Sequence, residues 1–416
     1  MLKRWRIRIL LFLAVLGPGF ITANVDNDSG GILTYSQAGA QYGYTLLWTI
    51  IPITLALIVV QEMCARMGVV TGKGLSDLIR EEFGLRLTVI LMAMLVVVNY
   101  TNVVTEFIGI AGSMHLFHVS KFISVPFCAA LVWYMVVKGN YKSTEKIFIV
   151  ASLVYICYIF AGVLSQPSWH DALLATVQLP QKSVWSDKAY MYMAIGVVGT
   201  TIAPWMQFYL QSSIVEKGIR VKDYAASRLD VIVGSLFTDI VAWFIIVACA
   251  ATLFVHGMGA IQVASDAAEA MRPLAGDYAF ILFAFGLFNA SLFAASILPL
   301  STAYTVCEGL GVESGVDKHF KEAPFFYWLY TSLIIGGAAT VLFLPDAQLI
   351  NVAILSQVLN GVLLPVVIIL MLMLINREDL MGEHKNTRLW NIIAWATSII
   401  VIGMTLVMLW GMMPGH

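Results

Sequence analysis

Long apolar runs alternate with short polar segments along the whole chain. Most runs reach the roughly 18–25 residues that a helix needs to cross about 30 Å of hydrocarbon. The longest polar segments, 166–188 and 256–275, fall on one side of the predicted membrane. We therefore predict an all-α polytopic membrane protein of about eleven spans, at residues 7–35, 45–66, 87–115, 121–138, 144–165, 189–216, 226–255, 276–307, 325–344, 347–376 and 389–411.

The positive charges predict how these spans are oriented. The chain starts with Lys3, Arg4, Arg6 and Arg8 but has no small-residue cleavage site, so the first span is a retained helix and not a signal peptide. Of the 24 lysines and arginines, all but four lie on the side of the N-terminus; the exceptions are Lys121, Lys182, Lys188 and Arg272. Since cytoplasmic loops carry the positive excess, we expect a multi-pass protein of the cell (inner) membrane with a cytoplasmic N-terminus and an extracellular C-terminus.

Polar residues interrupt the apolar pattern in the first and sixth predicted spans. The first contains two acids, two amides and a glycine pair within Asn24–Gly31, and the sixth contains Pro204 within Gly199–Gln207. Because an unpaired backbone group in lipid costs several kcal/mol, a helix is broken there only where it lines a cavity or a ligand. Paired breaks in two halves point to a transporter's substrate site. They predict two inverted five-helix repeats, 1–165 and 166–376, followed by one further helix in 377–416.

Composition excludes other classes of protein. The chain is 60% hydrophobic and only 12% charged, whereas soluble domains carry about 25% charged residues. Its five cysteines have no CxxC spacing, so they indicate neither a disulfide framework nor a thiolate metal site. The chain contains no HExxH motif and no nucleophile–base pair that would indicate an enzyme. We expect no cofactor and no nucleic-acid partner; the lipid bilayer and a transported ion are the expected partners, and the oligomeric state stays open, a monomer included.

Several stretches resemble one family of transporters. The chain is similar to the natural resistance-associated macrophage protein (Nramp) superfamily of divalent-metal transporters, which implies a leucine-transporter-like fold with helices 1 and 6 unwound. The matching stretches are Gly17–Phe20, Gln37–Gln41 with Tyr42 and Gly43, Gly68–Lys73, Leu355–Val358 with Pro365, and Leu380–Glu383.

The chain departs from the family pattern at the expected metal ligands. The first-helix motif Asp-Pro-Gly-Asn reads Asp28-Ser-Gly-Gly31 here, so the ligand Asp is retained and Gly31 replaces the ligand Asn. In the sixth helix Ala203 stands in place of a methionine whose thioether is a ligand.

The positions linked to proton movement differ too. Trp205 replaces a histidine, and Val103 replaces the first acid of an Asp-x-x-Glu motif that keeps Glu106. This combination resembles the Nramp-related magnesium transporters.

Ligand chemistry favours the same branch. Thioether sulfur suits softer transition metals, whereas carboxylates, carbonyls and water suit Mg²⁺, which keeps several waters. Losing the Asn and Met side chains leaves a wider, oxygen-lined pocket for a partly hydrated ion. We expect Asp28 to be the main ligand and backbone carbonyls near Ala203 to be contacts, with Gln207 and Gln357 binding through water.

Other polar residues inside the predicted spans allow two interpretations each. Asp239 either attracts cations or hydrogen-bonds a neighbouring helix. Asp26 either shares the unwound segment with the ion or is rotated away. Glu106 is either a remnant of a proton relay or, as we prefer, a structural hydrogen-bond partner. Glu62 and Arg66, at i,i+4 spacing, are expected to form a surface pair.

Two rival functions stay open at this point. A proton-coupled Mn²⁺ or Fe²⁺ transporter would need soft or proton-accepting groups at positions 103, 203 and 205. A sodium-coupled amino-acid transporter would place a substrate carboxylate in the site, and Asp28 would repel it. The favoured prediction is uptake of Mg²⁺, and also Mn²⁺, by alternating access without proton coupling.

Overall fold

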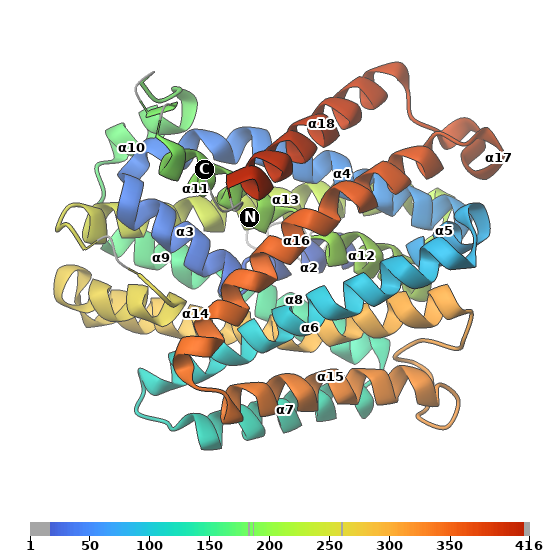
Figure 1. Ribbon diagram of the computed structural model, residues 1–416, viewed down its shortest axis with the longest axis horizontal. Coiled ribbons are helices and arrows are strands. Elements are labelled where there is room, and N and C mark those ends of the chain that lie inside the picture. The colour runs from blue at the N-terminus through green and yellow to red at the C-terminus, as the bar shows by residue number, and fades with distance from the viewer. Residues whose placement is uncertain (1–16, 182–183, 186, 259–260, 412–416) are drawn as a thin grey trace, which may run out of the picture.

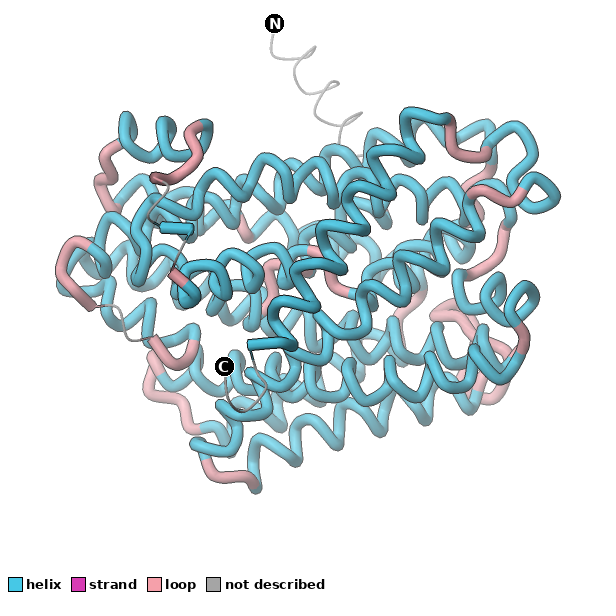
Figure 2. The backbone as a smooth tube through the Cα atoms, turned by 45° about the horizontal axis from the view of Figure 1, so that its top comes forward, coloured by secondary structure: helices cyan, strands magenta, loops and turns pink. Residues whose placement is uncertain are grey.

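The computed structural model describes residues 17–181, 184–185, 187–258 and 261–411, and their regular structure is entirely helical (Figures 1 and 2). Lys3, Arg4, Arg6, Arg8, Lys182 and part of the first predicted span lie outside the described residues. Within the described chain, eight helical stretches are long and apolar enough to cross a membrane, and the first of them, Ser29–Thr71, joins two predicted spans. The prediction of an all-helical, polytopic chain is confirmed.

The helices follow one another with short connections. The first half contains α2 (Pro18–Val25), α3 (Ser29–Tyr42), the 3₁₀ helix η1 (Gly43–Thr49), α4 (Ile50–Thr71), α5 (Leu75–Phe83), α6 (Leu85–His115), α7 (Lys121–Val137), α8 (Tyr141–Val154), α9 (Ile156–Leu164) and α10 (Trp169–Val177). The second half contains α11 (Lys188–Thr201), α12 (Pro204–Lys217), η3 (Val221–Asp223), α13 (Tyr224–Cys249), the π-helical turn η4 (Ala250–Phe254), α14 (Ala264–Leu310), α15 (Pro324–Phe343), α16 (Asp346–Ile375), α17 (Glu378–Met381), η5 (Gly382–His384) and α18 (Arg388–Gly411).

Both longer polar segments contain helix that the sequence pattern did not predict. Residues 166–188 include α10, and residues 256–275 include the first turns of α14. Helix α14 kinks at Gly276, where φ is 87°, a conformation that glycine adopts without strain. The predicted span 276–307 starts at this kink, so the hydropathy pattern located the boundary of the membrane segment but not the helix that precedes it.

Two glycines bring the short helix α2 against α13. A Cβ on Gly19 would lie 2.8 Å from the backbone nitrogen of Val231, and a Cβ on Gly234 would lie 2.6 Å from the Cα of Phe20. Side chains at either glycine would separate the two backbones. The backbones of α2 and α13 are therefore in direct contact at these two glycines.

One carboxylate fixes the start of α2. The side chain of Asp230, on α13, accepts hydrogen bonds from the backbone N–H groups of Gly17 and Gly19 at 2.7 Å and of Phe20 at 3.1 Å. These N–H groups have no partner within the helix because they belong to its first turn. The positive end of the helix dipole adds to the attraction. Asp230 thus clasps the N-terminus of α2 to α13.

The prediction of a surface pair between Glu62 and Arg66 is wrong. The two side chains do pair at i,i+4 spacing, with 3.2 Å between Nη2 and Oε2, but both residues are buried. The segment that follows α17 covers them: Arg66 donates to the carbonyl of His384 at 3.1 Å and to the amide oxygen of Asn386. Tyr224 donates to Glu62 from another side. These partners lie far away in sequence, so the local charge pattern could not reveal the burial.

Candidate functional site

The first break separates α2 from α3. Helix α2 ends at Val25 and α3 begins at Ser29, so the break falls on Asp26, Asn27 and Asp28, within the polar segment that predicts it. Asp28 is the N-cap of α3, and its Oδ1 accepts a hydrogen bond from the N–H of Gly31 at 2.7 Å. Side-chain acceptors at this position replace the missing helical partner. The cap holds the carboxylate at the N-terminal end of α3, where Asp28 is partly exposed.

The second break separates α11 from α12, and neighbouring residues of α12 satisfy the backbone groups of Ala203. Ala203 is extended, and Pro204 is the first residue of α12, where its lack of an N–H costs nothing. The N–H of Ala203 donates to the sulfur of Met206 at 3.3 Å. Its carbonyl accepts from the N–H of Met206 at 3.3 Å and from the side-chain amide of Gln207 at 3.1 Å. In this conformation the Ala203 carbonyl, predicted as an ion contact, already has two donors.

The atoms around Gly30 and Gly31 show which groups surround Asp28. A Cβ on Gly30 would lie 3.4 Å from the Oδ1 of Asp28 and would collide with the side-chain amide of Gln357. A Cβ on Gly31 would lie 3.5 Å from the same Oδ1 and 3.6 Å from the hydroxyl of Thr200. Asp28, Thr200 and Gln357 therefore meet around the two glycines, although they come from α3, α11 and α16.

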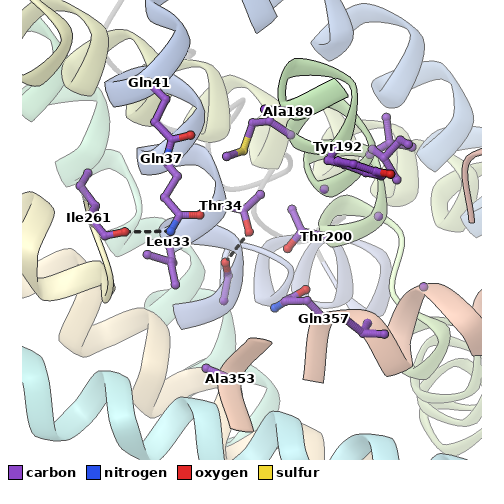
Figure 3. A pocket seen from close by; sticks show the side chains of 18 of the residues that line it. Leu33, Thr34, Gln37, Gln41, Ala189, Tyr192, Thr200, Ile261, Ala353 and Gln357 are labelled. Atoms are coloured by element: carbon purple, nitrogen blue, oxygen red, sulfur yellow. Dashed lines mark hydrogen bonds between the residues drawn. The ribbon is translucent and has the colours of Figure 1, made fainter. Parts of the chain in front are cut away.

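A cavity of about 740 Å³ leads to this meeting point (Figure 3). One wall is a face of α3, and Thr200 and Gln357 point into the cavity below Thr34 in the view of Figure 3. We call this cavity the vestibule. Its polar lining consists of amides and hydroxyls, among them Thr34, Gln37, Gln41, Thr200, Gln262 and Gln357.

The vestibule reaches the side of the molecule that carries the longer polar segments. Its lining includes Ala189, at the start of α11, and Ile261 and Gln262, just before α14. Gln37 donates to the carbonyl of Ile261 at 2.9 Å, which ties α3 to that rim (Figure 3). The charge bias predicts that this is the outer side.

The opposite side is held together by polar contacts. Lys217, at the end of α12, pairs with Glu145 of α8 at 2.6 Å. Glu216 accepts from the backbone N–H of Val316 at 2.7 Å. Together with the Asp230 clasp, these contacts join α2, α8, α12 and α13 and the segment after α14. The vestibule thus gives access to the first break from one side of the molecule, whereas polar contacts join the helices on the opposite side.

Gln357 and Gln207, the two predicted water-mediated ligands, have different surroundings. Gln357 lines the vestibule beside Gly30. Gln207 is 0% exposed, and its Oε1 has no hydrogen-bond partner among the described residues. Gln357 is therefore accessible from the vestibule, while Gln207 braces the second break.

Trp205 and Glu106 lie in the protein interior. Trp205 is 1% exposed, and its carbonyl accepts from Ser301 at 3.2 Å. Glu106 is 0% exposed and accepts a hydrogen bond from the N–H of Ser29 at 3.1 Å. That contact supports the structural interpretation of Glu106, since it caps the first turn of α3 beside Asp28.

Sequence reasoning missed Met206 and Thr200. Met206 comes three residues after Ala203, and its sulfur folds back onto the break. A Met at the third position of a helix that begins with Pro204 is the signal that was available. Thr200 is the penultimate residue of α11 and lines the vestibule. A thioether is therefore present at the second break, in the first turn of α12 and not at position 203.

The ligand set around Asp28 is sparse. Within the described residues, no three His, Cys, Asp or Glu side chains converge in a way that could hold a metal ion. The vestibule is lined by amides and hydroxyls, and the carboxylate of Asp28 lies beside Gly30, which is part of that lining. Such oxygen groups suit hard cations that retain part of their water.

Comparison with known proteins places the chain in a family. A family model described as natural resistance-associated macrophage protein-like matches residues 19–411. A divalent metal cation transporter, MntH, from Nostoc sp. is 28% identical and covers 96% of this chain and 92% of its own length. A protein of the same name from Ralstonia nicotianae is 29% identical, with 97% and 92% covered.

Solved structures share the fold. A manganese transporter from Eremococcus coleocola, in complex with an aromatic bis-isothiourea substituted compound, aligns with a TM-score of 0.73 at 22% identity, covering 95% of this chain and 86% of that one. A substrate-bound, outward-open Na⁺-coupled sialic acid symporter aligns with a TM-score of 0.63 at 11% identity, covering 94% and 90%. At these identities the likeness shows the fold alone.

Proposed function

Because the chain belongs to the Nramp family, whose members are metal-ion transporters and not enzymes, we propose that it takes up Mg²⁺, and also Mn²⁺, across the cell membrane. These transporters need no cofactor, since the metal ion is their substrate. The observation that carries the choice of Mg²⁺ is the sparse ligand set: one carboxylate, Asp28, at a wide vestibule lined by amides and hydroxyls.

The ion is proposed to bind with part of its water. Mg²⁺ gives up water reluctantly and is commonly held by one or two carboxylates. Asp28 supplies the charge, and Thr200 and Gln357 lie where they can hydrogen-bond the ion's water molecules. Gly31 and Ala203 stand where the main branch of the family has an amide and a thioether, so this chain offers neither of those two side chains as a ligand. These substitutions place the chain, in our proposal, in the Nramp-related magnesium branch.

Transport is proposed to follow the membrane potential without obligatory proton coupling. Trp205 and Val103 occupy the positions linked to proton movement and cannot titrate. The potential contributes about 2.3 kcal/mol per charge per 100 mV, which doubles for a divalent ion. With the vestibule facing outward, the ion would reach Asp28 from outside, and the two inverted repeats, 1–165 and 166–376, would move relative to each other to release it inside.

The test is uptake into proteoliposomes at a clamped potential, comparing Mg²⁺, Mn²⁺ and Ca²⁺ while intravesicular pH is recorded. We expect Mg²⁺ and Mn²⁺ to enter without stoichiometric acidification, and liposomes without protein to show neither uptake nor pH change. Selective uptake of Mn²⁺ with no Mg²⁺ would refute the proposed substrate. Acidification in proportion to metal entry would refute uncoupled transport.

A proton-coupled Mn²⁺ transporter is the second candidate. The sulfur of Met206 at the second break favours it, because a thioether is a soft ligand. The relative from Nostoc sp. is named a divalent metal cation transporter, and the solved structure from Eremococcus coleocola is named a manganese transporter. The sulfur, however, accepts the N–H of Ala203 and is buried. The same recording decides between the two, because only the second candidate acidifies the vesicles.

A further inference from the structure

Asp239 is a buried carboxylate without a hydrogen-bond partner. It lies on α13, is 2% exposed, and neither of its oxygens has a partner among the described residues. The hydroxyl of Thr54 is close enough to influence it but donates its proton to the carbonyl of Ile50 at 2.7 Å. An acid at membrane depth in this state points to a function.

Asp26 is a second such group on a different element. It lies in the first break, is 2% exposed, and its Oδ2 has no partner in the described part of the chain. It is close enough to Asp239 and to Asp28 to interact with both electrostatically. The first break and α13 thus each contribute a buried acid with at least one oxygen that lacks a partner among the described residues.

Asn27 fixes this meeting and adds an acceptor. Its amide nitrogen donates to the carbonyl of Thr238 at 3.0 Å and to the hydroxyl of the same residue at 2.7 Å. This bond pair holds the break against the residue that precedes Asp239. The Oδ1 of Asn27 is left without a partner, and Asn27 is 1% exposed. Only acceptors remain: Asp26 Oδ2, Asn27 Oδ1 and both oxygens of Asp239.

Two of these groups are carboxyl groups, which need a positive charge nearby when they are ionised. Uncompensated buried carboxylates cost several kcal/mol each, and no ion pair in the described residues involves Asp26 or Asp239. Neither residue lines the vestibule. The group is therefore not part of the vestibule lining, to which Thr200 and Gln357 belong.

We propose that Asp26, Asn27 and Asp239 form a second cation position for a hard divalent ion, distinct from the one at Asp28. The inference rests on the proposed function, because it takes its ion from the same route. Oxygen-only ligands suit Mg²⁺ and Mn²⁺. Two carboxylates balance two positive charges, whereas a monovalent ion would leave one negative charge unpaired in the interior. Two protein carboxylates plus water form a common arrangement for Mg²⁺.

The experiment counts bound ions on the purified full-length protein in nanodiscs. Mn²⁺ is the probe, because its free aquo ion has an electron paramagnetic resonance signal that is lost on binding. We expect about two Mn²⁺ per chain in the wild type and about one in Asp239→Asn or Asp28→Asn, since each change removes a carboxylate from one position only. Mg²⁺ should displace both ions.

Ser235→Ala is the matched control. Ser235 lies one turn before Asp239 on α13 and is likewise buried with an unpartnered oxygen, but it carries no charge. Its replacement should leave the number of bound ions unchanged. Thermal melting without metal confirms that each variant is folded, and Asp26→Asn serves as a second route to the same result should Asp239→Asn fail to fold.

The outcomes separate the two proposals. One Mn²⁺ in the wild type that persists in Asp239→Asn overturns the second position and leaves the proposed function intact. Loss of all binding in a folded Asp239→Asn protein also overturns it, because the two positions would then be one. No Mn²⁺ or Mg²⁺ binding by the wild type at all would refute the proposed function itself.

Discussion

The two breaks of the membrane helices differ in what fills them. The first, between α2 and α3, contains two acids and an amide and faces an open vestibule. The second, between α11 and α12, contains Ile202 and Ala203, and its backbone groups are satisfied by Met206 and Gln207. The first break therefore contains charged side chains, whereas the second contains only apolar side chains and backbone groups that already have hydrogen-bond partners. Paired breaks in such a fold need not contribute ligands equally.

The largest expected effect follows from removing the charge of the first break. Asp28→Ala should lower Mg²⁺ uptake at least about 30-fold, because losing one partner of a buried charge pair costs about 2–5 kcal/mol. Uptake of the metal into proteoliposomes measures it. Asp223→Asn, an exposed acid at the start of α13 with no capping hydrogen bond, is the control. Transport at the wild-type rate by Asp28→Ala would remove the central role of the first break.

Adding bulk to the first break should be the next largest effect. A Cβ on Gly31 would lie 2.6 Å from the carbonyl oxygen of Asp26, so Gly31→Ala must shift the break, at about 1–3 kcal/mol for overpacking. Both Mg²⁺ and Mn²⁺ uptake and the melting temperature should fall. Gly31→Asn, which restores the main-branch residue, meets the same obstacle.

Gly199 gives the matched control for that change. It also lines the vestibule, and a Cβ there would meet no atom within 4 Å. Gly199→Ala should therefore transport normally. Equal losses in both variants would mean that the space at Gly31 is not special.

The second break should respond in selectivity and not in rate. Ala203→Met adds a soft ligand and should shift the ratio of Mg²⁺ to Mn²⁺ uptake toward Mn²⁺ by about tenfold, or about 1.4 kcal/mol. Competition between the two ions for uptake measures the ratio. Ala203→Leu adds similar bulk without sulfur and should not produce the shift. An unchanged ratio in Ala203→Met would place selectivity elsewhere.

The smallest expected effects separate two glutamines. Gln357→Ala should raise the Mg²⁺ concentration for half-maximal uptake a few-fold, since a water-mediated contact is worth about 1 kcal/mol. Gln207→Ala should mainly lower the melting temperature, because it leaves the Ala203 carbonyl with one donor fewer. Exchanged results, with affinity lost at Gln207 and stability lost at Gln357, would reverse the roles given to the two residues.

Sequence reasoning predicted the spans and both breaks because each depends on local pattern. A helix that faces lipid is not expected to continue through residues such as Asp26, Asp28, Gly30 and Pro204. The burial of Glu62 and the approach of Gln357 to Gly30 depend on segments that are distant in the chain. Local periodicity contains no information about such partners, so these features needed coordinates.

The Asp230 clasp has a mechanical consequence. Hydrogen bonds to a charged group contribute about 1.5–3 kcal/mol each, and swinging α2 away from α13 would break all three of them together with the backbone contact at Gly19 and Gly234. Parting Lys217 from Glu145 separates one partly exposed pair. In the transport cycle proposed above, we therefore expect the contact between α12 and α8 to open more easily than the contact between α2 and α13, and α2 and α13 to move together.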